Sequence, residues 1–346
     1  MNNFLKNLHV MGYVSSYIFT NIIQPIFSKL PNTKESRHLY YTISPNCVLI
    51  ANTNLNMFTA EASNVSIPYL IFINTLEQCI IHGYNSNTLL SYVIESINVS
   101  SIIEFNCIND EISFYFDLSK NSISNKSDNN CYLLELACII PFVVVESELL
   151  DELIIVSQLI TDNHIKRLVF ICLGHLLLYV SKSKTDSLYD SSNWINRLTD
   201  MLFDNKFIQK ITGIIDIVDL RKFTFMLVKF NDKIINLTEY QHDVMQDIAD
   251  CFLISIENLP INLPGYSSDQ LLLLVIQILI YSKQWNELIT RSLLTYSNIK
   301  HISLLTSILY FYNNLSDTMH SHFDVANMFI DQHNFISLLF NNKKIK

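Results

Sequence analysis

The chain has 346 residues, 49% of them hydrophobic, which is enough apolar material for one elongated domain or two compact ones. The net charge is −9 and the basic residues are dispersed, so no cationic stripe is available for nucleic acid. Only five glycines occur and they stand far apart. This excludes the glycine-rich phosphate loops of P-loop, dinucleotide-binding and kinase sites, and also the serine-hydrolase elbow.

The N-terminal segment 7–28 contains no Lys, Arg, Asp or Glu and has nearly the length of a membrane span. Its interior is nevertheless polar at several positions, including Ser15, Ser16, Thr20 and Asn21. A packed N-terminal helix is therefore the favoured interpretation, and contact of this segment with a membrane stays open.

Residues 39–118 contain strand-like pieces among helices. Apolar and polar residues alternate over 101–108 and again over 111–118, on either side of the turn Asn109-Asp110, which predicts a β-hairpin. Another pair of strands is predicted within 40–57. Residues 1–118 are thus expected to form a smaller mixed α/β region, and the polar run 119–130 is expected to be a linker or a long loop.

Residues 131–346 are predicted to be an α-helical domain. No proline stands between Pro141 and Pro260, which suits long helices. Apolar periodicity predicts helices at 147–160, 164–180, 193–203, 207–217, 240–257, 269–283, 286–296, 300–312, 323–331 and 333–340. Ser147 is predicted to cap the first of these, and the helix at 164–180, apolar on all sides, should be surrounded by neighbours. The short connections near the C-terminal end predict hairpins, and so a mostly α fold built as an irregular, α-solenoid-like stack.

The residues that could carry chemistry form no recognisable catalytic or metal-binding set. Seven cysteines show no CxxC pair and no zinc spacing, and their number and apolar surroundings favour a reducing, cytoplasmic compartment. His320, His322 and Asp324 form an H-x-H-x-D string that lacks a further ligand. His175 lies in an apolar helix and is predicted to be a hydrogen-bonded core histidine. We therefore expect no cofactor, no metal and no catalytic residue.

Two features suggest contact with a partner protein. Asp243, Asp247 and Asp250 share one face of the predicted helix 240–257, where they could hold a cation, meet a basic partner or simply face solvent. Trp285 begins an amphipathic helix and is predicted to be a packing anchor or a binding residue.

Residues 285–340 resemble a known family. The carrying residues are the run Leu293-Leu294-Thr295-Tyr296, the apolar helix 304–309 and the stretch 329–339, where His333 follows an aliphatic pair and a polar pair. This pattern is similar to the C-terminal helical region of the colon-cancer-associated Mic-like family, which is related to the helical repeats of vesicle-tethering proteins. The chain departs from the family in a shorter segment 313–322 and in having room for at most a vestige of the family's β-propeller, in residues 39–118. The resemblance implies a non-catalytic subunit of the Mon–Ccz exchange complex, which activates a late-endosomal Rab GTPase, and it implies that His333 contacts a partner.

The sequence therefore predicts a non-catalytic helical scaffold or adaptor in a multiprotein complex of endosomal or vesicle trafficking. Its expected partners are other protein subunits, with peripheral association with endomembranes through the complex. Two alternatives stay open: a structural subunit of another large assembly, such as a mitochondrial one, and an enzyme with an unfamiliar helical active site.

Overall fold

A computed structural model describes residues 67–99, 132–182, 191–235, 266–282, 285–293 and 299–313, together with seven positions between residues 4 and 15. These residues are helical almost throughout and contain no β-strand, which confirms the prediction of a mostly α fold. The predicted β-hairpin at 101–118, the strands within 40–57 and the linker 119–130 lie outside the described residues.

Eleven α-helices and one 3-10 helix, η5, have defined bounds within these ranges. They are α4 (Ile67–His82), α5 (Ser86–Val99), η5 (Leu134–Cys138), α7 (Ile140–Val143), α8 (Glu146–Ile160), α9 (His164–Lys182), α10 (Ser191–Phe203), α11 (Asn205–Ile211), α12 (Ile217–Ile235), α14 (Ser268–Tyr281), α15 (Trp285–Leu293) and α16 (Ile299–Asn313). The predicted helices that correspond to α8, α9, α10, α14, α15 and α16 are confirmed, with ends that differ by a few residues.

Two local predictions were wrong. Val145, in an extended conformation, precedes the first turn of α8, so Ser147 lies inside the helix and does not cap it. The single helix predicted at 207–217 is instead the short α11 followed by a turn, in which Gly213 adopts a φ of 84°. A new helix, α12, begins after this turn. A positive φ is readily available only to glycine, so Gly213 allows the chain to reverse here.

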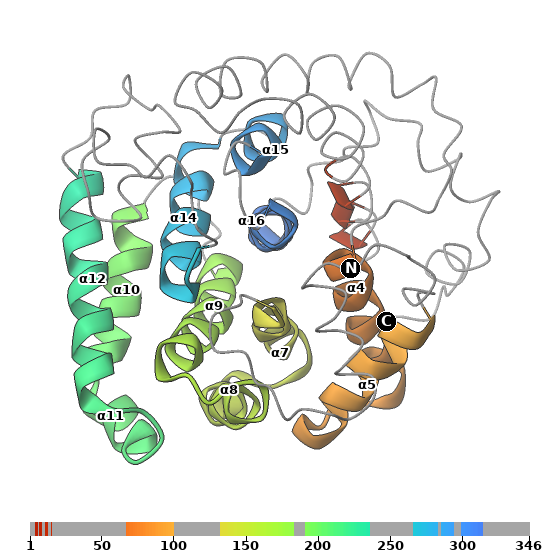
Figure 1. The fold of residues 1–346 in the computed structure, drawn as a ribbon, viewed down its shortest axis with the longest axis horizontal. Helices are drawn as coiled ribbons and strands as arrows, with labels where there is room; N and C mark the ends of the chain where they lie inside the picture. Colours follow the sequence, from red (N-terminus) through yellow and green to blue (C-terminus); the bar gives the residue numbers. More distant parts are fainter. Residues whose placement is uncertain are drawn as a thin grey trace, which may run out of the picture.

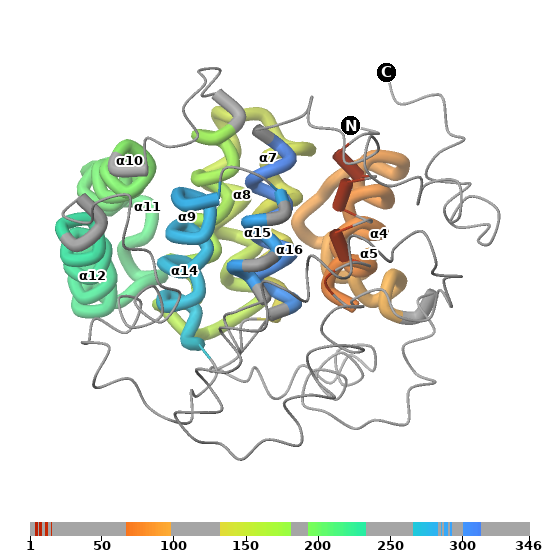
Figure 2. Tube along the Cα trace, turned by 90° about the horizontal axis from the view of Figure 1, so that it is seen from above, coloured from red at the N-terminus to blue at the C-terminus, as the bar shows by residue number. Residues whose placement is uncertain are grey.

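Helix α9 lies in the middle of the fold. It packs against η5, α7, α8, α10, α12, α14 and α16, as predicted from its apolar character on all sides. In Figures 1 and 2, α10 and α12 lie at one end of the molecule and α4 and α5 at the other. Gly174 of α9 allows the close approach of η5 and α8, because a Cβ atom there would lie 3.2 Å from the carbonyl oxygen of Ala137 and 2.8 Å from Leu153 Cδ1.

Buried hydroxyl groups join α4 to α16. The hydroxyl of Tyr69 lies 2.9 Å from Ser303 Oγ and 3.1 Å from Ser307 Oγ, all of them buried. Burial raises the pKa of Tyr69 to about 12, while the serine hydrogen bonds lower it, so the hydroxyl is protonated at neutral pH. Gly12 packs against the same ring, and a Cβ atom at this position would lie 2.7 Å from Tyr69 Cγ.

The N-terminal segment supplies apolar side chains to the same core. Phe4, Leu5, Leu8 and Met11 are helical and buried, in agreement with a packed helix at the start of the predicted segment. Residues 16–28 lie outside the described residues.

A second polar contact, between η5 and α16, is fully enclosed. Glu135 Oε2 lies 3.6 Å from His301 Nδ1, and both side chains are buried. The ring of Tyr132 packs against that of His301 with centroids 5.3 Å apart. Just before η5, Leu133 adopts a left-handed φ of 68°, which is costly for a bulky residue. The turn that carries Glu135 into the core is therefore strained.

Candidate functional site

One of the five residues predicted to contact a partner lies in the described part of the chain. Trp285 begins α15, where it is half-buried and packs against the hydrophobic core. The other four lie outside the described residues: Asp243, Asp247, Asp250 and His333. Their contacts with a partner stay predictions.

Helix α12, which was not predicted from the sequence, has two faces of different character. The inward face is apolar and buried, and consists of Leu220, Phe223, Met226, Leu227 and Phe230. These residues recur at spacings of one, three or four, so they share one side of the helix. Through this side α12 packs against α10, α9 and α14.

The outward face also carries large apolar side chains. Ile217 is 50% exposed, Val218 52%, Phe225 59% and Val228 37%. Figures 1 and 2 place this helix at the outer edge of the fold, beside α10. Isolated exposed apolar residues are ordinary, whereas several on one helix face make that face a candidate binding surface.

Three basic side chains share this outward face with the apolar ones. Lys222 Nζ lies 4.0 Å from Asp219 Oδ1, and Lys229 Nζ lies 4.6 Å from the centre of the Phe225 ring. Arg221 is exposed and forms no ion pair with any residue of the described ranges. We call this surface the α12 face; it consists of Ile217, Val218, Arg221, Lys222, Phe225, Val228 and Lys229. It is apolar and basic, in a chain whose net charge is −9.

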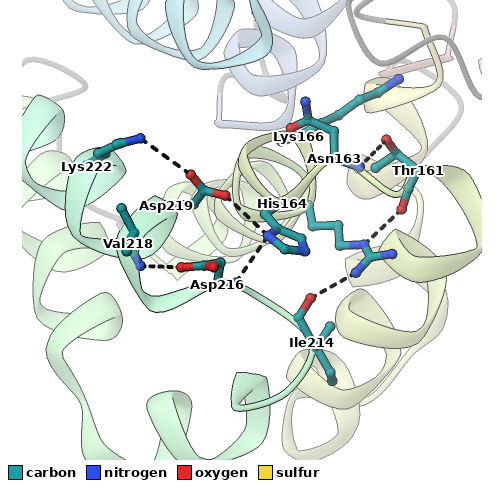
Figure 3. A network of polar contacts seen from close by, with 10 residues as sticks. Thr161, Asn163, His164, Lys166, Ile214, Asp216, Val218, Asp219 and Lys222 are labelled. Carbon is teal, nitrogen blue, oxygen red and sulfur yellow. Dashed lines mark hydrogen bonds and ion pairs between the residues drawn. The ribbon is translucent and has the colours of Figure 1, made fainter.

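The first turn of α12 is fixed to the start of α9 by the polar contacts in Figure 3. Asp216 caps α12, because its Oδ1 accepts a hydrogen bond from the backbone N–H of Val218 at 2.6 Å. His164 Nδ1 lies 3.2 Å from Asp219 Oδ2 and also 3.2 Å from the backbone nitrogen of Asp216. Depending on the tautomer, His164 Nδ1 accepts from the Asp216 N–H or donates to Asp219, so the ring ties α9 to this turn in both cases.

Arg167 ties the α8–α9 connection to the turn before α12. Its Nη1 donates to the carbonyl oxygen of Ile214 at 2.9 Å, and its Nε donates to the carbonyl oxygen of Thr161 at 2.8 Å. A third contact reaches Asp162 Oδ1 at 3.3 Å. Contacts from the start of α9 and from the α8–α9 connection therefore hold the turn before α12 and its first residues in place. The backbone that carries the exposed side chains of α12 is fixed at this end.

His175 differs from its prediction as a hydrogen-bonded core histidine. Its Nε2 atom is buried and has no hydrogen-bond partner. Burial lowers the pKa of His175 to about 4, and the Glu146 carboxylate opposes this shift only in part. The neutral ring packs 6.0 Å from that of Tyr179 and acts as a core side chain.

The lowered pKa of His175 makes the stability of the protein depend on pH in a way that can be measured. The folded-state pKa of about 4 lies below the ordinary value of 6.5, so the unfolded chain takes up the proton first as the pH falls. The contribution of His175 to the free energy of unfolding is therefore complete above pH 6.5 and is lost toward pH 4, with about 2 kcal/mol lost at pH 5. Urea unfolding at pH 7 and pH 5 should show this loss for the wild type relative to His175→Gln. Parallel pH curves for the two proteins would contradict the assignment.

The described residues contain neither a metal-binding cluster nor a helix suited to crossing a membrane. Among them, no group of three or more His, Cys, Asp or Glu side chains is placed to hold a metal ion. None of the described helices combines the length and the apolar character that crossing a bilayer requires. The buried thiols of Cys79, Cys138 and Cys172 are free, and burial raises the pKa of each, so they are unreactive at neutral pH.

One signal in the sequence could have revealed α12. Leu220, Phe223, Leu227 and Phe230 recur at i, i+3, i+7 and i+10, which is a helical period. Phe225 and Val228 fall outside that stripe, so the same pattern also indicates apolar residues on the second face.

Comparison with known proteins does not assign the chain to a family. No protein-family model matches it, and no curated protein matches it at a significant level. The resemblance of residues 285–340 to the Mic-like helical family therefore stays a prediction.

Proposed function

We propose that this protein is a non-catalytic helical scaffold that binds a partner protein through the α12 face. The observation that carries the proposal is the exposure of Phe225, Ile217, Val218 and Val228 on one outer helix whose opposite side is already buried in the core. Such a face loses apolar contact with water when a partner covers it, which is the main source of affinity at the centre of an interface.

The support beneath this face favours binding. The contacts of His164, Arg167 and Asp216 fix the first turn of α12, and the core packs against its full inner side. A surface that is held in its binding conformation before association loses little conformational entropy when it binds. This arrangement suits a scaffold, which provides shape and area and does no chemistry.

The proposal extends to architecture and setting. The helices would form an irregular stack of hairpins, with α10 and α12 as an end layer. End layers of such stacks need either a polar outer face or a covering partner. The α12 face is apolar in part, so a partner subunit would cover it. Endosomal or vesicle trafficking on the cytoplasmic side of membranes is the proposed setting, and it rests on the resemblance of residues 285–340.

The test is purification of the tagged full-length protein from its own cells, with quantitative mass spectrometry of what accompanies it. The variant Phe225→Ser with Val228→Ser changes the α12 face. The matched control is Ile81→Ser, which removes an apolar side chain that is 51% exposed at the end of α4. We expect a partner that is retained by the wild type and by Ile81→Ser but lost from the α12 variant.

Both variants change exposed side chains, so each should keep its stability within about 0.5 kcal/mol of the wild type. Recovery of the same partners by all three proteins would contradict a role for the α12 face. Recovery of Mon and Ccz homologues with an endosomal Rab would support the trafficking setting, and recovery of mitochondrial subunits instead would contradict it.

A further inference from the structure

The chemistry of the α12 face narrows the kind of partner that fits it, provided that the proposed function holds. We propose that the partner presents an amphipathic α-helix whose apolar stripe contains a carboxylate, and that this carboxylate pairs with Arg221. The proposal rests on the order of side chains along α12 and on the charge that they carry.

The side chains form a stripe that matches a helix in length. Ile217, Arg221, Phe225 and Val228 stand at i, i+4, i+8 and i+11, so they follow one side of α12 over roughly 16 Å at 1.5 Å per residue. Main-chain pairing with an added strand requires a free sheet edge, and the described residues contain no strand. The remaining mode for a helix face of this length is a second helix packed along it, ridge into groove.

Arg221 determines the charge that the partner must carry. It lies between Ile217 and Phe225 in the stripe, so a helix that covers these two residues also covers the guanidinium. Lys222 already lies near Asp219, and Lys229 lies over the Phe225 ring, whereas Arg221 has no ion pair in the described ranges. A guanidinium removed from water without a partner is costly, and a carboxylate satisfies it with two parallel hydrogen bonds. Arginine beside an aromatic residue is also typical of the residues that dominate binding energy.

Two other occupants fit less well. In a symmetric pair of chains the face would meet itself and would bring three basic residues, Arg221, Lys222 and Lys229, against the same residues of the second copy, with Asp232 as the acidic residue to offset them. A bilayer surface binds helices with a wide apolar side, and α12 buries its wider apolar side in the core, leaving four apolar residues outside. Asp232, exposed one turn beyond Val228, would also face lipid phosphate.

The test uses a displayed library of amphipathic helical peptides of roughly four turns, with one position in the apolar stripe open to every residue type. Selection is performed on the full-length protein, on Arg221→Glu and on Phe225→Ser. Lys206→Glu on α11 is the control, because Lys206 is exposed and the substitution changes the net charge by the same amount.

We expect Asp or Glu at the open position of peptides selected by the wild type and by Lys206→Glu, and Lys or Arg at that position with Arg221→Glu. A peptide with Glu should bind Arg221→Glu about tenfold more weakly than the wild type, as the loss of one charge-assisted pair predicts.

The outcomes separate this inference from the proposed function. Peptides that need Phe225 but show no preference for an acidic residue would overturn the carboxylate pairing and leave the α12 face as a binding surface. Peptides that bind Phe225→Ser as well as the wild type would overturn both. Binding to phosphatidylserine vesicles that is lost in Phe225→Ser would overturn the proposal in favour of a bilayer. A dimer that Arg221→Glu dissociates would overturn it in favour of a second copy.

Discussion

Replacing His301 with leucine is expected to lower the free energy of unfolding by about 3–5 kcal/mol, although the side-chain volume is nearly conserved. The reason is the buried contact between His301 Nδ1 and Glu135 Oε2, at 3.6 Å. Both side chains lie inside the protein, and neither oxygen of Glu135 has a hydrogen-bond partner. Without the imidazole, the carboxyl group of Glu135 would stay buried and would lose the polar side chain beside it, and a buried polar group without a partner is costly.

The size of this effect comes from the loss of one partner and not from the strength of the pair. Glu135→Met alone should also destabilise the protein, because it leaves a buried imidazole facing an apolar side chain. The double variant Glu135→Met/His301→Leu replaces both groups with apolar ones of similar volume, and such replacements are often neutral. We expect the double variant to be more stable than His301→Leu alone, as measured by urea unfolding at pH 7. Additive losses in the double variant would contradict a specific pairing of the two residues.

Burial of the leucines around Glu135 explains why the strained backbone before it is tolerated. Leu133, in the left-handed region at φ 68°, costs about 1–3 kcal/mol relative to an ordinary conformation. Leu133, Leu134 and Leu136 are buried on either side of Glu135, so this short segment gains apolar contact on several sides. Burial of several leucines, at about 1.5–3 kcal/mol each, outweighs the strain. The chain therefore enters the core in a conformation that its local preferences disfavour.

Much of the helical content follows from local periodicity. The segments that became α8, α9, α14 and α16 repeat apolar residues every three or four positions, and a pattern of this kind is independent of the rest of the chain. The central place of α9 could be predicted as well, because a helix that is apolar on all sides must be covered on all sides.

The errors arose where one residue or a distant contact determines the structure. Gly213 ends the predicted helix 207–217 because its backbone turns at a φ of 84°, and the following α12 was missed. Because α12 was not predicted, the residues of the α12 face were missed, and the predicted binding residues lie elsewhere in the chain. The Glu135–His301 pair has no local signal, because the two residues are far apart in the chain and only the packing of η5 on α16 brings them together.

A substitution at Gly174 is the second change that we expect to affect stability strongly, and this effect also depends on packing between distant segments. Replacing it with alanine is expected to destabilise the protein by about 2 kcal/mol. An added Cβ would lie 2.8 Å from Leu153 Cδ1, with Leu153 Cδ2 closer still, and 3.2 Å from the carbonyl oxygen of Ala137. Overpacking a filled core costs about 1–3 kcal/mol, and the upper end applies because α8 and η5 are both in the way. The better helix propensity of alanine offsets this steric cost by at most about 1 kcal/mol.

A double-mutant cycle separates this steric cause from a general loss of helix stability. Leu153→Ala removes the methyl groups that the new Cβ would meet, and by itself it should cost about 2–5 kcal/mol by opening a cavity. In Leu153→Ala/Gly174→Ala, the alanine at position 174 partly fills that cavity, so its own cost should vanish or change sign. We expect a coupling energy of about 1–3 kcal/mol between the two positions from urea unfolding. Strict additivity would mean that α9 tolerates a side chain at position 174 without contact with Leu153, and the close packing of α9 on α8 would then be wrong.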